Sequence, residues 1–153
     1  MQKITPFLWL NGNVEEAINF YTSVFKNAKI LNVRRMGGDK GKVFTATFEL
    51  EGQQFMALDG GPHFSFTPAI SFFVDCKSQE EVDDLWTKLI ADGGEESRCG
   101  WLKDKFGLSW QIIPQELGKY LSDSDSKKVQ NVMQAMLQMN KIIIKDLDEA
   151  YKG

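Results

Sequence analysis

The chain has 153 residues, of which 42% are hydrophobic, and this is enough for one domain with a sizeable core. Its formal net charge of -3 at pH 7 argues against a nucleic-acid partner. No stretch approaches the roughly 20 apolar residues that span a membrane, and the N-terminal residues lack an apolar signal core. We therefore expect a cytoplasmic protein, and two cysteines are too few for a disulfide scaffold.

The first half of the chain predicts one helix among four strands. Asn13 is the expected N-cap of the helix, with Glu15 and Glu16 in its first turn. A helical stripe of apolar residues follows: Val14, Ala17, Ile18, Tyr21 and Phe25. The strands are expected over residues 4–10, 30–35, 43–50 and 54–59.

Residues 60–68 join this half to a second one with the same order. Ser78 is followed by three acidic or amide side chains, which is a capping-box pattern at the start of a helix. The apolar stripe of this helix is Val82, Leu85, Trp86 and Leu89. The strands are expected over residues 69–74, 96–99, 101–103 and 108–113. After Pro114, a short helix over 115–121, a polar linker and two further helices are expected.

The two halves contain an internal repeat. The helix segment Val14–Tyr21 returns as Gln79–Trp86, and each copy follows a short apolar strand. Two strand–helix–strands units normally share one concave sheet, so the repeat predicts a central pocket between them. The predicted organisation is one domain over residues 1–153. It comprises a first module at 1–62, a second module at 68–114 and C-terminal helices at 115–153.

Five motifs in this order resemble the PhnB-like subfamily of the vicinal oxygen chelate superfamily, also called the glyoxalase and bleomycin-resistance superfamily. They are Asn11-Gly-Asn-x-Glu-Glu-Ala17 with Phe20-Tyr21, Asp59-Gly60-Gly61, Gln79-Glu-Glu-Val-Asp-x-Leu-Trp86, Cys99-Gly-Trp-x-x-Asp-x-Phe-Gly-x-Ser-Trp-Gln111 and Ala135-Met-x-x-Met139. The resemblance implies an α+β fold of paired βαβββ modules with a C-terminal helical extension. Members often carry a demethylubiquinone methyltransferase label. However, the sequence has no Gly-rich strand-to-helix turn for S-adenosylmethionine.

The resemblance also marks the positions where other members of the superfamily bind a divalent ion with His, Gln or Glu. In this chain they fall near Thr5, Ala57, Ala69 and Gln111. Two alanines cannot ligate a metal, and the remaining side chains are too few for a site. The only histidine, His63, lies in the joint between the halves. We therefore expect no metal and no cofactor.

Strand alternation assigns the side chains that would line the pocket. We expect Met56 and Leu58 to pack under a helix, leaving Phe55 to face the cavity. Aromatic side chains with sparse polar anchors are typical of small-molecule sites. The predicted ligand-binding residues are Phe7, Trp9, Phe55, Asp59, Phe64, Phe66, Phe73, Trp101 and Gln111, with Phe64 and Phe66 in a covering loop.

The sequence thus predicts a metal-free protein that binds a small molecule. One alternative is a metal-independent enzyme that uses Asp59, with a raised pKa, or Cys99; Asp59 could instead only brace a turn. A metal-dependent lyase or dioxygenase and a pure interaction module are further alternatives. We also expect Asp104 to shape the turn at 103–107. A homodimer is predicted to pair through the C-terminal helices, where Met133, Met136 and Met139 form a flexible apolar set.

Overall fold

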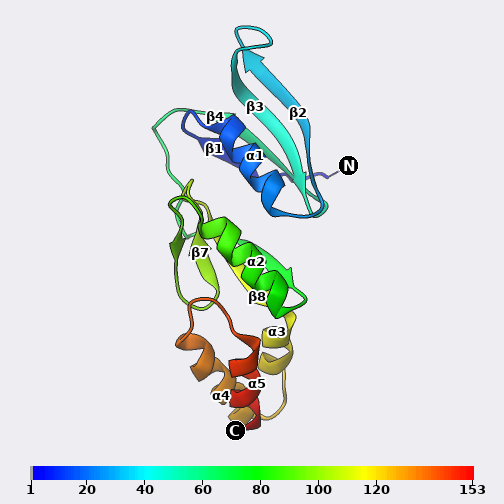
Figure 1. The fold of residues 1–153 in the computed structure, drawn as a ribbon, viewed down its shortest axis with the longest axis vertical. Coiled ribbons are helices and arrows are strands. Elements are labelled where there is room, and N and C mark those ends of the chain that lie inside the picture. The colour runs from blue at the N-terminus through cyan, green and yellow to red at the C-terminus, as the bar shows by residue number, and fades with distance from the viewer. Residues whose placement is uncertain (1) are drawn as a thin grey trace. The chain divides into compact units, whose positions relative to one another are not determined.

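The computed structural model describes residues 2–153. Within this range the chain divides into two compact units, the first ending at Ser65 and the second beginning at Phe66. Each unit has the same order of elements, a strand, a helix and three further strands (Figure 1). The predicted α+β class with two βαβββ modules is therefore confirmed, and the expected C-terminal helices follow the second module.

The first unit is a four-stranded sheet with one helix. Its elements are β1 (Phe7–Leu10), α1 (Val14–Val24), β2 (Ala28–Met36), β3 (Lys42–Leu50) and β4 (Gln53–Asp59). The strand order is β1-β4-β3-β2, in which β1 runs parallel to β4 and the other neighbours are antiparallel. Parallel neighbours need a crossover connection, and α1 lies within it, on one face of the sheet (Figure 1).

The core of the first unit lies between α1 and the sheet. The predicted stripe of the helix is buried throughout, at Val14, Ala17, Ile18, Tyr21 and Phe25. The ring of Tyr21 stacks on Phe48 of β3 with 6.1 Å between centroids, and Phe48 stacks on Phe55 of β4 at 5.4 Å. Large aromatic side chains bury much apolar area, so this stack holds the helix on the sheet.

The second unit repeats the arrangement and continues into three helices. Its elements are β5 (Phe72–Cys76), α2 (Gln79–Ile90), β6 (Glu95–Glu96), β7 (Trp101–Lys103), β8 (Ser109–Pro114), α3 (Gln115–Leu121), α4 (Ser126–Leu137) and α5 (Ile144–Lys152). The strand order is β5-β8-β7-β6, again with one parallel pair, β5 with β8. The stripe predicted for α2 is buried at Val82, Leu85, Trp86 and Leu89.

The start of α2 confirms its predicted cap. The Ser78 side chain accepts a hydrogen bond from the backbone N–H of Glu81 at 3.1 Å. The Glu81 carboxylate in turn accepts from the backbone N–H of Lys77 at 3.0 Å. Two backbone donors at the helix start are thereby satisfied, as in a capping box, with the second bond made to the residue before the N-cap rather than to Ser78 itself.

Two strands begin three residues later than predicted. Strand β1 starts at Phe7 rather than at residue 4, and β5 starts at Phe72 rather than at residue 69. Pro6 and Pro68 explain the difference, because proline has no backbone N–H for a sheet. The segment after Pro68 forms a turn instead, in which Ile70 N–H donates to the carbonyl of Thr67.

The three C-terminal helices form a small core of their own with the end of β8. Its buried members are Ile113, Leu117, Val132, Met139, Ile142 and Leu147. Polar contacts attach this tail to the rest of the second unit. The Gln79 side chain on α2 donates to the carbonyl of Ile142 at 3.0 Å and accepts from the N–H of Ile144 at 2.7 Å. The tail is thus part of the second unit.

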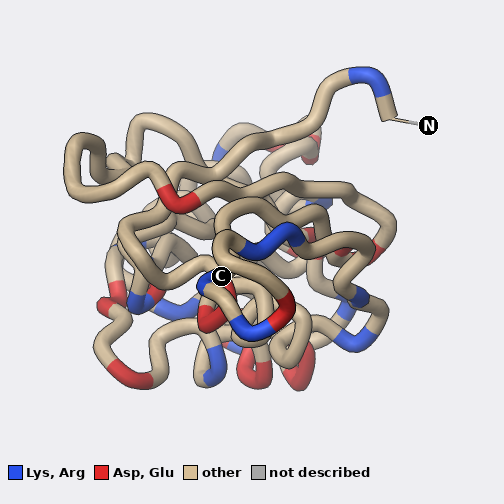
Figure 2. Tube along the Cα trace, turned by 90° about the horizontal axis from the view of Figure 1, so that it is seen from above, with Lys and Arg blue, Asp and Glu red and all other residues tan. Residues whose placement is uncertain are grey.

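Charged residues of both signs follow one another along the described chain (Figure 2). Several form ion pairs, including Lys88 with Asp84 at 3.1 Å within α2 and Lys141 with Asp83 at 2.9 Å between the tail and α2. Among residues 2–153, no helix is both long and apolar enough to cross a membrane.

Candidate functional site

The first sheet has a face away from α1, here called the first open face. Leu8 and Leu10 of β1 are buried on the α1 side, whereas Phe7 is 50% exposed and Trp9 is half-buried. Because side chains alternate across a strand, Phe7 and Trp9 lie on the first open face. This orientation agrees with the prediction for β1.

Strand β4 is oriented opposite to the prediction. Met56 pairs with Phe7 and Leu58 pairs with Trp9 in the parallel register, so Met56 and Leu58 lie on the first open face. The expectation that Phe55 faces the cavity is wrong, because Phe55 is only 4% exposed and stacks in the core under α1. The side chains on both faces of β4 are apolar, so hydrophobic alternation cannot tell which face is buried. The register with β1 determines the orientation instead.

The indole of Trp9 is fixed by the loop that follows β4. Its Nε1 donates to the carbonyl of Gly61 at 3.0 Å, and Phe64 meets the ring edge-on with 4.9 Å between centroids. A Cβ on Gly60 would come within 2.2 Å of the indole, so only glycine allows this close approach. Phe64 therefore lies against Trp9, whereas Phe66 belongs to the second unit and is half-buried.

Asp59 braces the turn at the end of β4. One carboxylate oxygen accepts from the N–H of Gly12 at 2.8 Å and of Gly61 at 3.3 Å, and the other lies 3.2 Å from Lys42 Nζ. The Gly12 hydrogen bond, followed by that from Lys42, lowers the pKa of Asp59. The alternative that Asp59 has a raised pKa for acid–base catalysis is therefore wrong.

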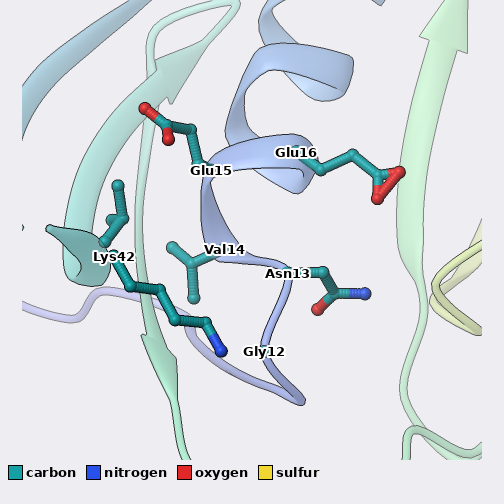
Figure 3. Close-up of a pocket in the computed structure, with 7 residues that line it drawn as sticks. Gly12, Asn13, Val14, Glu15, Glu16 and Lys42 are labelled. Atoms are coloured by element: carbon teal, nitrogen blue, oxygen red, sulfur yellow. The ribbon is translucent and has the colours of Figure 1, made fainter. Parts of the chain in front are cut away.

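A hollow of about 230 Å³ lies at the N-terminal end of α1 (Figure 3). It is lined by Gly12, Asn13, Val14, Glu15, Glu16, Lys42 and Val43. Asn13 does not cap the helix through its side chain, contrary to expectation, and its buried Oδ1 has no hydrogen-bond partner among the described residues. The Glu15 carboxylate pairs with Arg35 at 2.5 Å and Lys42 pairs with Asp59, so the main charges of the hollow are neutralised within the protein.

The second sheet also has a face away from its helix, here called the second open face. Phe73 on β5 is 60% exposed there and pairs with Gln111 on β8, which pairs with Trp101 on β7. Gln111 Nε2 donates to the hydroxyl of Ser71 at 3.0 Å, which fixes the amide. The orientation of β5 and β8 agrees with the prediction.

The turn between β7 and β8 is built on Asp104, as expected. This buried carboxylate accepts hydrogen bonds from the backbone N–H of Phe106 and Leu108 and from Trp110 Nε1, at 2.9, 3.1 and 2.9 Å. A carboxylate with several donors is stable inside a protein, so Asp104 has a structural role.

The structure therefore divides the predicted site residues between two faces. Phe7, Trp9 and Phe64 meet on the first, and Phe73, Trp101 and Gln111 meet on the second. Sequence reasoning missed four further side chains of the first open face: Thr45, Thr47, Met56 and Leu58. Only cross-strand pairing identifies these residues, and it depends on the register of neighbouring strands.

A sequence model of the family described as 3-demethylubiquinone-9 3-methyltransferase matches residues 2–113. The chain belongs to this family. The family match covers both βαβββ modules, so the first and second open faces lie within it. It ends in β8, before α3–α5, and the tail motif at 135–139 falls outside it.

Solved structures place the family in the vicinal oxygen chelate superfamily. The PhnB protein from Bacillus cereus is 42% identical, with 74% of this chain and 99% of that chain covered and a TM-score of 0.68. A Pseudomonas aeruginosa protein is 20% identical over 74% and 98% of the two chains, with a TM-score of 0.64. The fosfomycin resistance protein FosX from Listeria monocytogenes is 16% identical over 74% and 93%, with a TM-score of 0.54. The last two show a shared fold. No curated protein matches the chain.

The superfamily's metal positions do not fit an ion in this family member. Ala57, at one of these positions, is fully buried under α1 and offers no ligand atom. Ala69 offers none either, and the Gln111 amide nitrogen is bonded to Ser71. In the described range 2–153, no three His, Cys, Asp or Glu side chains lie close enough to hold a metal ion.

Both cysteines are free thiols, in different surroundings. Cys76 is buried, and burial, with the nearby carboxylate of Glu81, raises the pKa of its thiol to about 12. Such a thiol stays protonated and unreactive at neutral pH. Cys99 is half-buried in a turn with φ +59°, and its backbone N–H donates to the carbonyl of Met139.

Proposed function

We propose that the chain binds a small organic molecule on its first open face without a metal ion. The observation that carries this proposal is that Trp9 is both fixed and partly accessible. Its indole is held by Gly61 and Phe64, yet the side chain is only half-buried. An aromatic ring that is already immobile loses little entropy on stacking with a ligand. Such a face, mostly apolar with few hydrogen-bonding groups, is typical of small-molecule sites.

The second open face, within its own unit, is proposed to offer a contact for a small molecule as well. Its support is the juxtaposition of two aromatic rings, Phe73 and Trp101, with the amide of Gln111 between them along the strand pairing. Phe66 remains in the proposed set as part of the loop that begins the second unit.

Binding is preferred to metal-independent catalysis because of Asp59. A general acid or base at neutral pH needs a carboxyl with a raised pKa, and the hydrogen bonds to Asp59 act in the opposite direction. The enzymatic alternative would then depend on Cys99. Within residues 2–153 the Cys99 thiol makes no hydrogen bond to a base, and its turn is held by a hydrogen bond from the Cys99 N–H to the carbonyl of Met139.

We further propose a cytoplasmic homodimer that pairs through α4. Met133 and Leu137 are 43% and 49% exposed, and their spacing puts them on the same side of the helix. Met136 and Met139 pack into the tail core instead. Light scattering should give twice the chain mass of 17.4 kDa, and a Met133→Lys variant should give the single mass. A concentration-independent single mass for the unaltered chain would refute the dimer.

Fluorescence tests the binding proposal. Phenylnaphthylamine is a neutral aromatic probe that accepts energy from tryptophan, so its titration reports an adjacent indole. We expect saturable energy transfer that Trp9→Phe greatly reduces. The matched variant Trp86→Phe, at an indole buried in the core of the second unit, should leave it largely intact. Equal responses of both variants, or an unchanged signal in Trp9→Phe, would show that the first open face is not the site.

A further inference from the structure

We infer that the ligand of the first open face is an amphipathic organic anion, with its apolar body on Trp9 and its anionic group at Arg34. This inference rests on the proposed binding function of that face. It comes from the order in which side chains follow one another across the four strands.

The strand register places two complete rows of side chains on the first open face. Directly paired residues on neighbouring strands point to the same side of a sheet. The first row is Trp9, Leu58, Thr45 and Arg34. The neighbouring row is Phe7, Met56, Thr47 and Asn32.

Both rows change chemically in the same direction. Each begins with an aromatic ring on β1, continues with an aliphatic side chain on β4 and a threonine on β3, and ends with a polar group on β2. With neighbouring strands about 4.8 Å apart, a row extends about 14 Å between the outer backbones. A molecule lying along the rows would contact apolar surface at one end and hydrogen-bonding groups at the other.

Arg34 gives the polar end its charge. It is exposed, and its guanidinium takes part in no hydrogen bond or ion pair with residues 2–153. Lys29, another cation facing this side, lies 3.9 Å from the carboxylate of Glu49. An unpaired guanidinium binds carboxylate, sulfonate or phosphate oxygens through paired N–H donors, so the complementary head group is an anion.

The neighbouring Arg35 is a natural control. It pairs with buried Val43 and therefore points to the α1 side of the sheet, where its guanidinium pairs with Glu15 and donates to the carbonyl of Gly41. Replacing Arg34 or Arg35 by glutamine changes the net charge equally. Only Arg34→Gln removes a cation from the first open face.

Two matched probes test the inference. Anilinonaphthalene sulfonate and phenylnaphthylamine share one aromatic body, and only the first carries an anion. We measure the part of the tryptophan energy transfer that Trp9→Phe abolishes. The full-length chain should bind the sulfonate about three- to tenfold more tightly than the neutral probe, the range expected for one charge-assisted contact near the surface. Added salt should reduce this preference.

Arg34→Gln should remove the preference, whereas Arg35→Gln and the charge-conserving Arg34→Lys should largely retain it. Thermal melts of all three variants confirm that they are folded. A preference that is absent, that survives in Arg34→Gln, or that falls equally in Arg35→Gln would overturn the inference while binding of the neutral probe stands. If neither probe gives a signal that depends on Trp9, the proposed binding function fails as well.

Discussion

Tyr120 and Tyr151 stack with 4.4 Å between their ring centroids, and each donates its hydroxyl to an aspartate beside the other. Tyr120 bonds to Asp148, three residues before Tyr151, and Tyr151 bonds to Asp123, three residues after Tyr120. The two hydrogen bonds therefore cross between the same two segments, α3 with its following turn and α5. This reciprocal contact lies on the tail that follows the family match.

The tail, α3–α5, should lose stability at alkaline pH. The hydrogen bond to Asp148, with burial and nearby carboxylates, raises the pKa of Tyr120 to about 12, compared with about 10 in an unfolded chain. Because the folded pKa is the higher one, the contribution of Tyr120 is complete below about pH 10 and is lost as the pH rises through about 12. Circular dichroism during a pH titration should show helix loss in this window.

Tyr120→Phe provides the comparison for this titration. It should lower the free energy of unfolding near neutral pH by about 1 kcal/mol, the typical value for one hydrogen bond. It should also make the alkaline loss shallower, while the contribution of Tyr151 remains. An alkaline transition identical in both chains would show that Tyr120 does not cause it.

Gly100 should be far more sensitive to substitution than Gly118. Gly100 has φ +84°, and a Cβ there would come within 2.6 Å of the Ile113 side chain and 3.1 Å of the carbonyl of Ile112. Gly100→Ala should therefore destabilise the second unit by roughly 2–3 kcal/mol. Gly118 lies in α3 with open space around it, so Gly118→Ala should be neutral or stabilise by up to about 1 kcal/mol. Chemical denaturation measures both, and similar losses would contradict the steric argument.

The two helix starts show what local sequence can and cannot predict. At Ser78 the cap forms as expected, because both partners lie within four residues. At Asn13 it does not, because the preceding Gly12 is held by a hydrogen bond from its N–H to Asp59, in a strand far along the chain. A contact between distant residues sets the chain's entry into α1, and a short motif carries no information about it.

The candidate site, like the helix starts, is predictable from the sequence only in part. The repeat predicted both modules, and alternation placed Phe7, Trp9 and Phe73 on open faces because their neighbours in sequence are clearly core residues. Strand β4 gives no such contrast, so alternation alone places Phe55 on the wrong side. The rows that end at Arg34 and Asn32 cannot be seen in the sequence, since they require the register of four strands and not the pattern of one.

The two cysteines should differ in reactivity. Cys76 is buried with a pKa raised to about 12, whereas Cys99 is half-buried. A disulfide reagent at neutral pH should therefore label one thiol in the folded protein and both in denaturant. Cys99→Ser should abolish the labelling of the folded protein. Rapid labelling that persists in Cys99→Ser would show that Cys76 is accessible.

Gln79 should determine whether the tail stays attached to α2. Gln79→Ala removes the hydrogen bonds to the backbone of Ile142 and Ile144, and these groups lose partners in a largely buried position. Two such bonds are worth about 2 kcal/mol, so we expect a lower thermal midpoint and faster amide exchange across α4 and α5. Exchange in α1 should not change, because the first unit has its own core. Gln115→Ala is the control, since that side chain makes one 3.5 Å contact to the carbonyl of Lys77. If both variants accelerate tail exchange equally, Gln79 has no special role in attachment.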